Sequence, residues 1–402
     1  MQSIRNMPNL VNSGDCCGCS ACASTCPRTA ISMQADDEGF LHPVIDEGEC
    51  IECRQCETVC PGLNPAYNND AVGLTYVVQH KDEAVRYQST SGGAFTAIAE
   101  EIIRRNGVVF GAIMTKEMRV VHDSVETIEE LGKFRNSKYV QSEIGDCLIR
   151  VRDLLNAGRW VCFSGTPCQI NGLIKFLKKD YHKLITVDVV CKSVPSPLVF
   201  NKYVEFKKEK EGPISDIVFR DKKRGFLYCT MAHYLSHEDR MSAKDCYRRG
   251  SESDEWLRLF LSGMISRRSC INCGYQTLKR VSDITLGDIW ETGVRGLDDN
   301  KGTTLLSVWT HKGLEIIGSI TNEARVVEYP MVRRQERINT NHLDPDRNKV
   351  FHDLNHLSAE EFFRKYSPRT IKVRMKEFGR FFVWKLHLHN FIRRIKHFVI
   401  HM

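Results

Sequence analysis

The N-terminal part of the chain carries one cysteine spacing twice, in DCCGCSACASTCP at 15–27 and in ECIECRQCETVCP at 49–61. Each stretch reads C-x2-C-x2-C-x3-C-P, a spacing that holds 4Fe-4S clusters in pairs, with the fourth cysteine of each run bound to the other cluster. We therefore predict two 4Fe-4S clusters. Their predicted ligand sets are Cys16, Cys19, Cys22 and Cys60 for the first, and Cys50, Cys53, Cys56 and Cys26 for the second.

Structural zinc is the main alternative for these cysteines. Zinc sites need four ligands each, commonly supplied as two separated C-x2-C pairs rather than a run that ends in Cys-Pro. The spacing therefore favours iron–sulfur chemistry, and Cys17 is interpreted as a bystander beside Cys16. We expect residues 10–66 to form an α+β ferredoxin-like domain with a short hairpin between the two runs, followed by a Gly-, Pro- and Asn-rich linker at 62–70.

Length and composition narrow the class of protein. A chain of 402 residues suggests more than one domain, and 42% hydrophobic with 27% charged residues excludes a mostly disordered chain. The longest apolar run, 108–114, is too short to cross a bilayer, and the first residues lack the apolar core of a secretory signal. Seventeen cysteines in a chain without an export signal favour metal or redox chemistry over disulfides, so we expect a cytoplasmic protein.

Residues from 71 to about 330 alternate short β-branched runs with amphipathic stretches. The pattern predicts strands at 74–78, 108–113, 160–163, 185–190 and 305–310, and helices at 94–105, 144–156, 170–178 and 197–208. Such alternation favours an α/β body with a mostly parallel sheet. Ligands of these sheets bind at the carboxyl ends of the strands, which directs attention to the loops that follow them.

Four loop segments of the body could carry chemistry. Ser89-Thr90-Ser91-Gly92-Gly93 opens a helix, where free backbone amides could bind a phosphate, although an ordinary N-cap has the same appearance. Four further cysteines lie in loops or at strand ends and would suffice for a third 4Fe-4S cluster. These four are Cys168, Cys191, Cys270 and Cys273, whereas Cys147, Cys162, Cys229 and Cys246 are interpreted as structural. Taken one at a time, Cys168 and Cys191 are better explained as buried thiols, and the C-x2-C pair at 270–273 could also be a redox pair, half of a metal site or two core thiols.

Several of these stretches together resemble a known family, the beta subunit of coenzyme F(420)-reducing hydrogenase and formate dehydrogenase, in the version with an N-terminal two-cluster ferredoxin domain. The matching stretches are YQSTSGGAFTAIAEEII (87–103), SKYVQSEIGD (137–146), FSGTPCQINGL (163–173), VDVVCKSVPSP (187–197), RSCINCGY (268–275) and SDITLGDIW (282–290). The resemblance spans roughly residues 12–330, and the chain looks closest to the bacterial members encoded among polysaccharide-biosynthesis genes.

The resemblance implies an iron–sulfur flavoprotein oxidoreductase that moves electrons between 4Fe-4S clusters and FAD, with FAD rather than FMN resting on the resemblance alone. Its partners would be a ferredoxin or similar low-potential donor, or a reduced deazaflavin, and an organic small-molecule substrate. Residues that match the family's flavin segments are Ser91, Gly92, Gly93, Thr96, Lys138 and Tyr139, and the four body cysteines match its cysteine positions. No catalytic residue is assigned; Asp283 and Asp288 could orient a ligand or simply close turns.

The resemblance also implies a division of the chain. We expect a flavin domain at 71–160, the C-terminal domain of the beta subunit at 161–330 and a connector at 331–361, all after the ferredoxin-type domain. Two other functions remain open on the sequence: an electron-relay subunit of a larger redox complex without its own substrate, and a tail-driven binding module in which the clusters are structural. The sequence also permits a homo-oligomer.

The last part of the chain differs from the rest in charge. Residues 362–402 hold 11 Lys and Arg and one acid, Glu377, which gives +10, whereas the remaining 46 basic and 49 acidic residues give −3. From Leu388 onward the apolar residues follow helical spacing, which predicts a basic amphipathic helix. Such a helix suits peripheral contact with the inner face of a membrane, or docking on the body or on an oligomer partner. Nucleic-acid binding is not expected, because no recognised module accompanies the charge.

Overall fold

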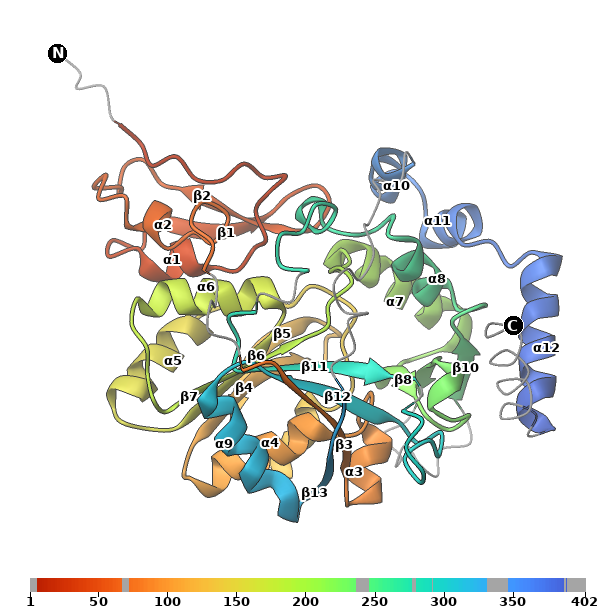
Figure 1. The fold of residues 1–402 in the computed structure, drawn as a ribbon. Coiled ribbons are helices and arrows are strands. Elements are labelled where there is room, and N and C mark those ends of the chain that lie inside the picture. The colour runs from red at the N-terminus through yellow and green to blue at the C-terminus, as the bar shows by residue number, and fades with distance from the viewer. Residues whose placement is uncertain are drawn as a thin grey trace.

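The computed structural model describes residues 6–66, 72–235, 246–276, 280–290, 292–330, 346–386 and 388 (Figure 1). All predicted strands and helices of the body are present, with ends displaced by three residues at most. The segment predicted as an amphipathic helix from Leu388 onward lies outside the described residues, apart from Leu388 itself.

The N-terminal region is a small α+β unit. It consists of α1 (Ala21–Thr25), β1 (Ile31–Ala35), β2 (Leu41–Ile45) and α2 (Gln55–Thr58), and the two strands pair antiparallel with Ile31 opposite Ile45. The expected hairpin between the two cysteine runs is therefore present. Each cysteine run wraps one of the short helices, so the fourth cysteine of each run follows a helix.

The body is built on one eight-stranded sheet in the order β13-β3-β12-β11-β7-β6-β4-β5. Its strands are β3 (Leu74–His80), β4 (Val108–Met114), β5 (Val120–Val125), β6 (Val161–Gly165), β7 (Leu184–Val189), β11 (Ile284–Ile289), β12 (Thr303–Val308) and β13 (Ala324–Glu328). The sheet takes strands from both segments predicted as separate domains, 71–160 and 161–330.

The sheet is mixed rather than mostly parallel. Its four central strands, β11, β7, β6 and β4, run parallel to one another, whereas β5 at one edge and β12, β3 and β13 at the other pair antiparallel. The α/β class is confirmed, and the parallel prediction holds for the centre only. The reason is local: β4 and β5 form a hairpin, and β11 and β12 are joined without a crossover helix.

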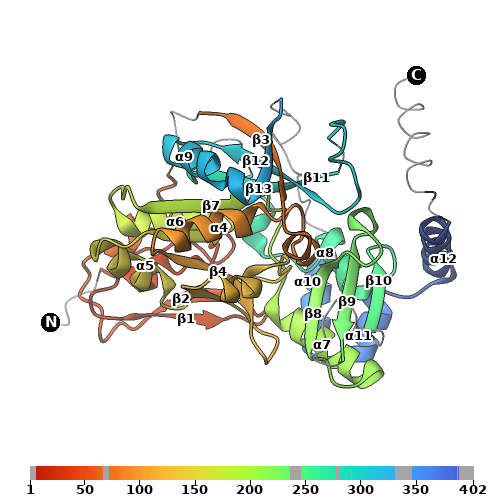
Figure 2. The same cartoon turned by 90° about the horizontal axis from the view of Figure 1, so that it is seen from below.

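Helices cover both faces of this sheet (Figures 1 and 2). On one face α4 (Ala94–Arg104) and α9 (His311–Ser319) pack against the strands together with the 3-10 helices at Glu129–Phe134 and Ile320–Asn322. On the other face lie α5 (Cys147–Asn156) and α6 (Pro167–Leu177), and α1 of the cysteine-rich region packs on top of them. A short helix, α3 (Glu83–Gln88), follows β3.

A second core surrounds a three-stranded antiparallel sheet that the sequence did not predict. Its strands are β8 (Asp216–Asp221), β9 (Thr230–Tyr234) and β10 (Cys246–Gly250), in the order β10-β9-β8. The helices associated with it are α7 (Pro197–Glu211), α8 (Glu255–Ser262), α10 (Arg347–Leu354) and α11 (Ala359–Tyr366). Beyond them α12 (Ile371–Lys385) lies at the edge of the molecule (Figure 2).

The cysteine-rich region is fixed to the body by a buried guanidinium. Arg267 is 1% exposed and donates to the backbone oxygens of Cys16 at 2.6 Å and Leu41 at 2.9 Å, and to Gln141 Oε1 at 2.9 Å. Gln141 in turn donates to the backbone oxygen of Cys17 at 3.1 Å. Because a buried charge is tolerated only when it is fully hydrogen-bonded, this network holds the first cysteine loop in one place.

Candidate metal centres and redox site

The eight N-terminal cysteines line two separate cavities. One cavity, with an empty volume of about 380 Å³, is lined by Cys16, Cys19, Cys22 and Cys60, together with Cys17. The other, of about 330 Å³, is lined by Cys26, Cys50, Cys53 and Cys56. These are the two sets predicted from the spacing, with the fourth cysteine of each run contributed to the other set's cavity.

The two cavities differ in their access to solvent. Every cysteine of the first set is buried, at 7–9% exposure, and we call it the inner set. In the second, outer set Cys53 is exposed, Cys26 and Cys50 are half-buried, and only Cys56 is buried. The outer set therefore faces solution, whereas the inner set faces the body.

The two loops that wrap the cavities repeat one backbone conformation. Gly18 and Ser20 in the first run have φ of 69° and 61°, and the equivalent Glu52 and Arg54 in the second run have φ of 57° and 56°. Of these four positions, only position 18 requires a glycine. A Cβ on Gly18 would lie 2.7 Å from Gln141 Nε2 and 3.0 Å from Arg267 Nη1, so the body packs directly against this loop.

The donor set of each cavity fits a cubane cluster. Among the described residues, no three His, Cys, Asp or Glu side chains gather around a point that could hold a single metal ion. A 4Fe-4S cluster does not require that arrangement, because it is bound by four thiolates. Each cavity is lined by four cysteines, which is the donor chemistry that such a cluster needs.

The four body cysteines also come together. Cys168 begins α6 directly after β6, Cys191 follows the neighbouring parallel strand β7, and Cys270 and Cys273 approach from the 3-10 helix Arg268–Cys270. Burial and the neighbouring thiols of Cys270, Cys168 and Cys273 raise the pKa of Cys191 well above its usual range. We call these four cysteines the third set; they lie at the carboxyl ends of two parallel strands, where α/β sheets place their ligands.

Cys17 connects the inner set with the third set. Its side chain is hydrogen-bonded to Cys168 and lies beside Cys19, and burial contributes to raising the pKa of Cys17. Helix α6 packs against the inner set, since a Cβ on Gly172 would lie 2.8 Å from Cys19 Sγ. Tyr275 spans the same gap and donates to the backbone oxygen of Pro61 at 2.9 Å. The sequence analysis interprets Cys17 as a bystander, because its position next to Cys16 gives no information about contacts with distant residues such as Cys168.

Most residues of the first predicted flavin segment contact other parts of the protein. Ser91 Oγ donates to the backbone oxygen of Thr303 at 2.5 Å, and the Gly92 amide donates to Thr304 Oγ1 at 2.9 Å. A Cβ on Gly92 would lie 2.1 Å from the backbone oxygen of Val78. Gly93 is the N-cap of α4 with φ of 86°, and Thr96 is buried. This segment seats α4 on the sheet, and its roles toward a flavin stay a prediction.

The second predicted flavin segment lies beside the first. Thr90 Oγ1 donates to Ser137 Oγ at 2.9 Å, and Lys138 Nζ is turned to the backbone oxygens of Lys133 and Arg135. Tyr139 stacks on Phe260, with ring centroids 4.6 Å apart, and burial raises the pKa of Tyr139 to about 12. The tyrosine hydroxyl accepts from Arg220, a residue that the sequence did not single out.

Arg220 is the centre of a buried polar site at the end of β11. It is 5% exposed, and Nη1 donates to Tyr139 Oη at 3.2 Å and to Asp288 Oδ2 at 2.8 Å. Its guanidinium lies over the rings of Phe226 and Trp290, at 5.1 and 5.3 Å. Within the part of the chain that the structure describes, the buried Nη2 has no hydrogen-bond partner, although Trp290 beside it is 49% exposed. An orphaned buried donor next to an exposed aromatic ring is a feature that a bound ligand would complete.

The two acidic candidates have different roles. Asp283 accepts from the amide and hydroxyl of Thr186, both at 2.7 Å, and from Thr310 Oγ1 at 2.6 Å, so it ties the start of β11 to β7 and to the residues after β12. Asp288 is the acid that pairs with Arg220. The turn-closing interpretation therefore describes Asp283, and the ligand-orienting one stays open for Asp288.

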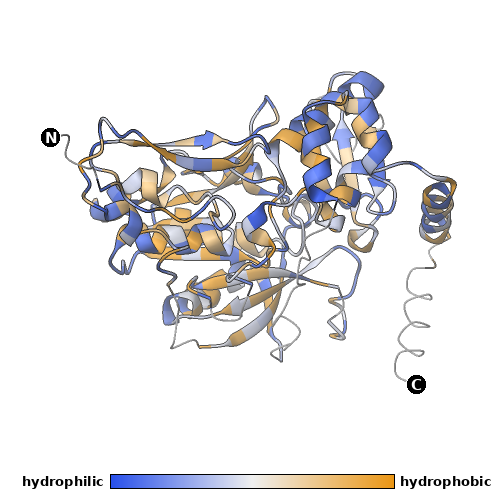
Figure 3. Ribbon diagram, turned by 90° about the horizontal axis from the view of Figure 1, so that it is seen from above, coloured by the Kyte–Doolittle hydropathy of each residue, from blue (hydrophilic) through white to orange (hydrophobic). Residues whose placement is uncertain are grey.

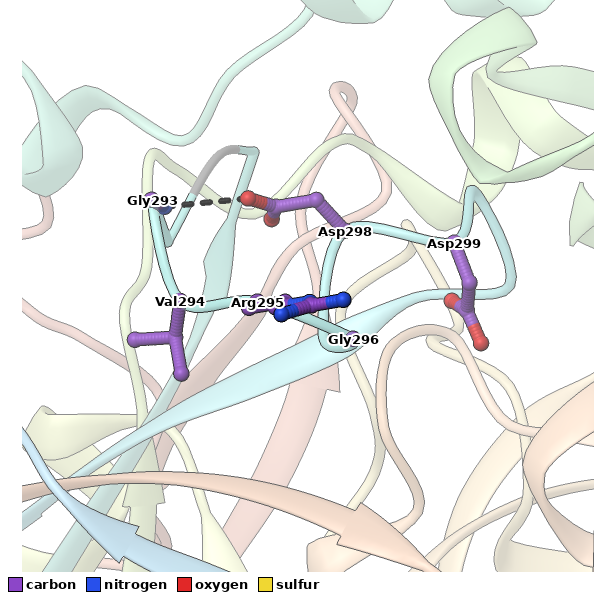
Figure 4. Close-up of a pocket in the computed structure, with 6 residues that line it drawn as sticks. All are labelled: Gly293, Val294, Arg295, Gly296, Asp298 and Asp299. Carbon is purple, nitrogen blue, oxygen red and sulfur yellow. Dashed lines mark hydrogen bonds between the residues drawn. The ribbon is translucent and has the colours of Figure 1, made fainter.

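A shallow surface cavity, with an empty volume of about 520 Å³, lies in the loop after β11 (Figure 4). Asp298 shapes the loop by accepting from the Gly293 amide at 3.0 Å and from Thr292. Its neighbour Asp299 forms a bidentate ion pair with the buried Arg86, at 2.7 and 2.6 Å. Lys222 donates to the backbone oxygens of Arg86 and Ser91, and burial together with the charge of Arg86 lowers the pKa of Lys222 to about 7. Thus the predicted segment at Ser91 is linked to this loop.

A line of side chains leads from the third set to Arg220. Cys191 is followed by Lys192, whose Nζ lies 5.9 Å from the centre of the Phe260 ring. Phe260 stacks on Tyr139, which contacts Arg220. The outer, inner and third cysteine sets and the Arg220 site are therefore arranged in succession.

Two family models match the chain. Residues 15–62 match the 4Fe-4S dicluster domain, and residues 158–333 match the C terminus of the coenzyme F420 hydrogenase/dehydrogenase beta subunit. Residues 158–333 are therefore similar to the C terminus of this beta subunit. The match confirms the resemblance predicted from the sequence, and the dicluster match supports iron–sulfur clusters and an electron-transfer role.

Other comparisons add little. A chain of the xenon-derivatized F420-reducing NiFe hydrogenase complex from Methanosarcina barkeri shares 14% identity with this one; the match covers 76% of this chain and 96% of that chain, with a TM-score of 0.46. No curated protein matches the chain.

The packing role of Gly92 can be tested by Gly92→Ala. Because the added methyl group meets the Val78 backbone oxygen, we expect the substitution to lower the free energy of unfolding by about 2–3 kcal/mol, measured by urea denaturation. Gly132→Ala is the matched control, since its Cβ has nothing within 4 Å and should change stability by less than about 1 kcal/mol. Equal stability of the two variants would contradict the packing role.

Proposed function

We propose that this chain is an iron–sulfur flavoprotein oxidoreductase that moves electrons from a low-potential donor to an organic substrate. The succession of cysteine sets carries the proposal. It begins at the exposed Cys53, continues through the buried inner set and Cys17, and ends at the third set, from which Lys192, Phe260 and Tyr139 lead to the Arg220 site. A chain that used its clusters only as structural staples would not need such an order.

The cysteines would hold two 4Fe-4S clusters in the outer and inner cavities and a third cluster between Cys168, Cys191, Cys270 and Cys273. When bound, these clusters supply one-electron transfer. The chain's own contribution is position and environment. It buries the inner set against α6, fixes the first loop through Arg267, and leaves the outer set accessible to a partner.

The Arg220 site fits a planar, anionic cofactor of the flavin type. The orphaned Nη2 provides a buried cationic donor, Trp290 provides an exposed aromatic face, and Tyr139 and Asp288 fix the guanidinium. A bound FAD would supply the exchange between single electrons and hydride equivalents. Tyr139 belongs to a segment matched to the family's flavin motif, which is a second reason to place the cofactor here.

An electron-relay subunit without its own substrate is the second candidate. The family match favours it as well, because the family is named for a subunit. The exposed Trp290 at the Arg220 site favours a site that is open to a substrate. The identity of the organic substrate, and a place in polysaccharide biosynthesis, stay predictions from the family resemblance.

The charge of the cysteine-rich region constrains the donor. Residues 15–62 contain nine Asp and Glu and two Arg, a net charge of −7. Glu49 and Glu52 directly flank Cys50 and Cys53 of the outer set. An acidic donor would be repelled at this surface, so a donor whose docking surface is basic is favoured.

The cluster assignments can be tested by iron and sulfide analysis after anaerobic purification. We expect about twelve irons per chain for three clusters, against about eight for two. Cys22→Ala and Cys191→Ala should each remove about four irons, because each loses one ligand of a different set. Cys147→Ala, which removes a buried thiol of α5 outside the sets, is the control and should keep the full content. Two irons or fewer in the wild type would refute the redox proposal.

The flavin site can be tested by Arg220→Met. We expect the wild type to retain about one FAD per chain and the variant to retain about tenfold less, because a charge-assisted hydrogen bond is lost. Arg224→Met is the matched control: this arginine lies over the rings of Tyr228 and Phe381 instead. Flavin released by denaturation and identified by chromatography is the measurement. Equal flavin content in both variants, at equal melting temperatures, would place the cofactor elsewhere.

The acidic charge of the cysteine-rich region predicts that added salt slows reduction of the protein by a cationic donor. Stopped-flow reduction by the cationic methyl viologen radical should slow as KCl is added, because salt screens the attraction to the acidic region. Glu49→Gln with Glu52→Gln should weaken this dependence, whereas Glu205→Gln with Glu209→Gln on α7 should leave it unchanged. Loss of the salt dependence in the α7 variant alone would show that the donor docks elsewhere.

A further inference from the structure

Helix α12 presents most of its large apolar residues to solvent, whereas Val373 is buried. Ile371, Met375, Phe378 and Phe382 follow one another at spacings of four, three and four residues and therefore share one face. They are 78%, 69%, 67% and 49% exposed. Leu386 continues the row and is also exposed at 49%. We call this row the α12 stripe; a soluble protein rarely exposes so many large apolar side chains in one line.

The opposite face of α12 includes the buried Val373 and is tied to the body by polar contacts. Arg380 donates to Glu252, to Ser251 Oγ at 3.2 Å and to the backbone oxygen of Tyr228 at 2.7 Å. Glu377 forms ion pairs with Arg369 at 2.6 Å and Arg249 at 3.7 Å. These contacts fix which face of the helix points away from the body, so the exposure of the stripe follows from the packing. Figure 3 shows the helix at the edge of the molecule, with hydrophobic and hydrophilic residues along it.

The charges beside the stripe all have one sign. Lys372, Arg374, Lys376 and Lys385 of α12 are exposed. At helical spacing, Lys372 and Arg374 lie on either side of the stripe. The one acid of residues 362–402, Glu377, is on the inward face and is already paired. An apolar row flanked by basic residues and without acids on the outward side complements an anionic surface that has an apolar layer beneath it.

From this arrangement we propose that the α12 stripe is a docking surface for an anionic lipid bilayer. The helix lies in the plane of the interface, its Phe side chains enter the acyl boundary, and the lysine and arginine heads remain at the level of the phosphates. A second copy of the chain suits the surface less well, because two such faces would bring their basic flanks together. Among the described residues, no helix is long and apolar enough to span a bilayer, and interfacial binding does not require one.

The docking surface is connected to the Arg220 site. Arg380 holds the backbone of Leu227 and Tyr228, and Arg224 lies over the rings of Phe381 and Trp384 of α12. The same loop carries Phe226, which packs on Trp290 at 5.0 Å and lies beneath the Arg220 guanidinium. Lipid binding through α12 would therefore bring the exposed edge of the Arg220 site close to the membrane surface.

Co-sedimentation of the full-length chain with lipid vesicles tests the proposal. We expect the wild type to sediment with vesicles of phosphatidylcholine mixed with phosphatidylglycerol more than with phosphatidylcholine alone. Phe378→Gln with Phe382→Gln should lower the partition coefficient at least about tenfold, because two side chains no longer enter the lipid. Lys372→Gln with Lys376→Gln should weaken binding to the anionic vesicles and reduce its sensitivity to salt.

Val44→Gln with Ile128→Gln is the matched control, since both residues are exposed apolar side chains far from α12 in the sequence, at 44% and 40% exposure. This variant should bind vesicles as the wild type does. The proposal fails if the wild type prefers neither lipid composition, or if the Phe378/Phe382 variant binds as tightly as the control. Analytical ultracentrifugation gives the remaining outcome: a wild-type dimer that the Phe378/Phe382 variant converts to a monomer, without vesicle binding, would assign the stripe to a second copy and overturn the lipid proposal.

Discussion

The seating of the first cysteine loop against the body is the constraint on which the arrangement of the redox groups depends. Arg267 can be buried only because the backbone oxygens of Cys16 and Leu41 and the side chain of Gln141 satisfy it. The loop can approach this closely only because Gly18 has no Cβ. These contacts turn the inner set toward α6 and bring Cys17 against Cys168. Together with the hydrogen bond from Tyr275 to the Pro61 backbone, they give the cysteine-rich region a defined position relative to the third set.

The sequence predicted the local chemistry well and the distant contacts poorly. The C-x2-C-x2-C-x3-C-P spacing places both N-terminal sets, because ligands close in sequence are close in space. The strands and helices of the body also follow from periodicity. The predicted parallel sheet, by contrast, holds only for the four central strands, since a hairpin and a crossover cannot be distinguished from the strands' own patterns.

The residues that sequence reasoning missed share one property: their partners are far away along the chain. Arg220 acquires its role from Tyr139, Asp288 and Trp290, which lie on two other segments of the chain. Cys17 acquires its position from Cys168, which lies 151 residues later. The signal that could have pointed to Arg220 is its place in β8, where a buried strand position holds an arginine instead of an apolar residue. The sheet that contains β8 was itself not predicted, so that signal could not be read.

The two ends of the molecule carry net charges of opposite sign. The cysteine-rich region, with −7 over residues 15–62, and helix α12, in the segment with +10 over residues 362–402, lie at opposite ends of the molecule (Figures 1 and 2). An anionic surface would attract the α12 end and repel the cysteine-rich end, which is the orientation that the exposed stripe alone would also produce. In that orientation the outer set and Cys53 face solution, where a donor can reach them, while the Arg220 site lies toward the membrane. Charge and hydrophobicity therefore favour the same orientation. In that orientation, one end of the row of cysteine sets faces a donor and the other end faces the lipid surface.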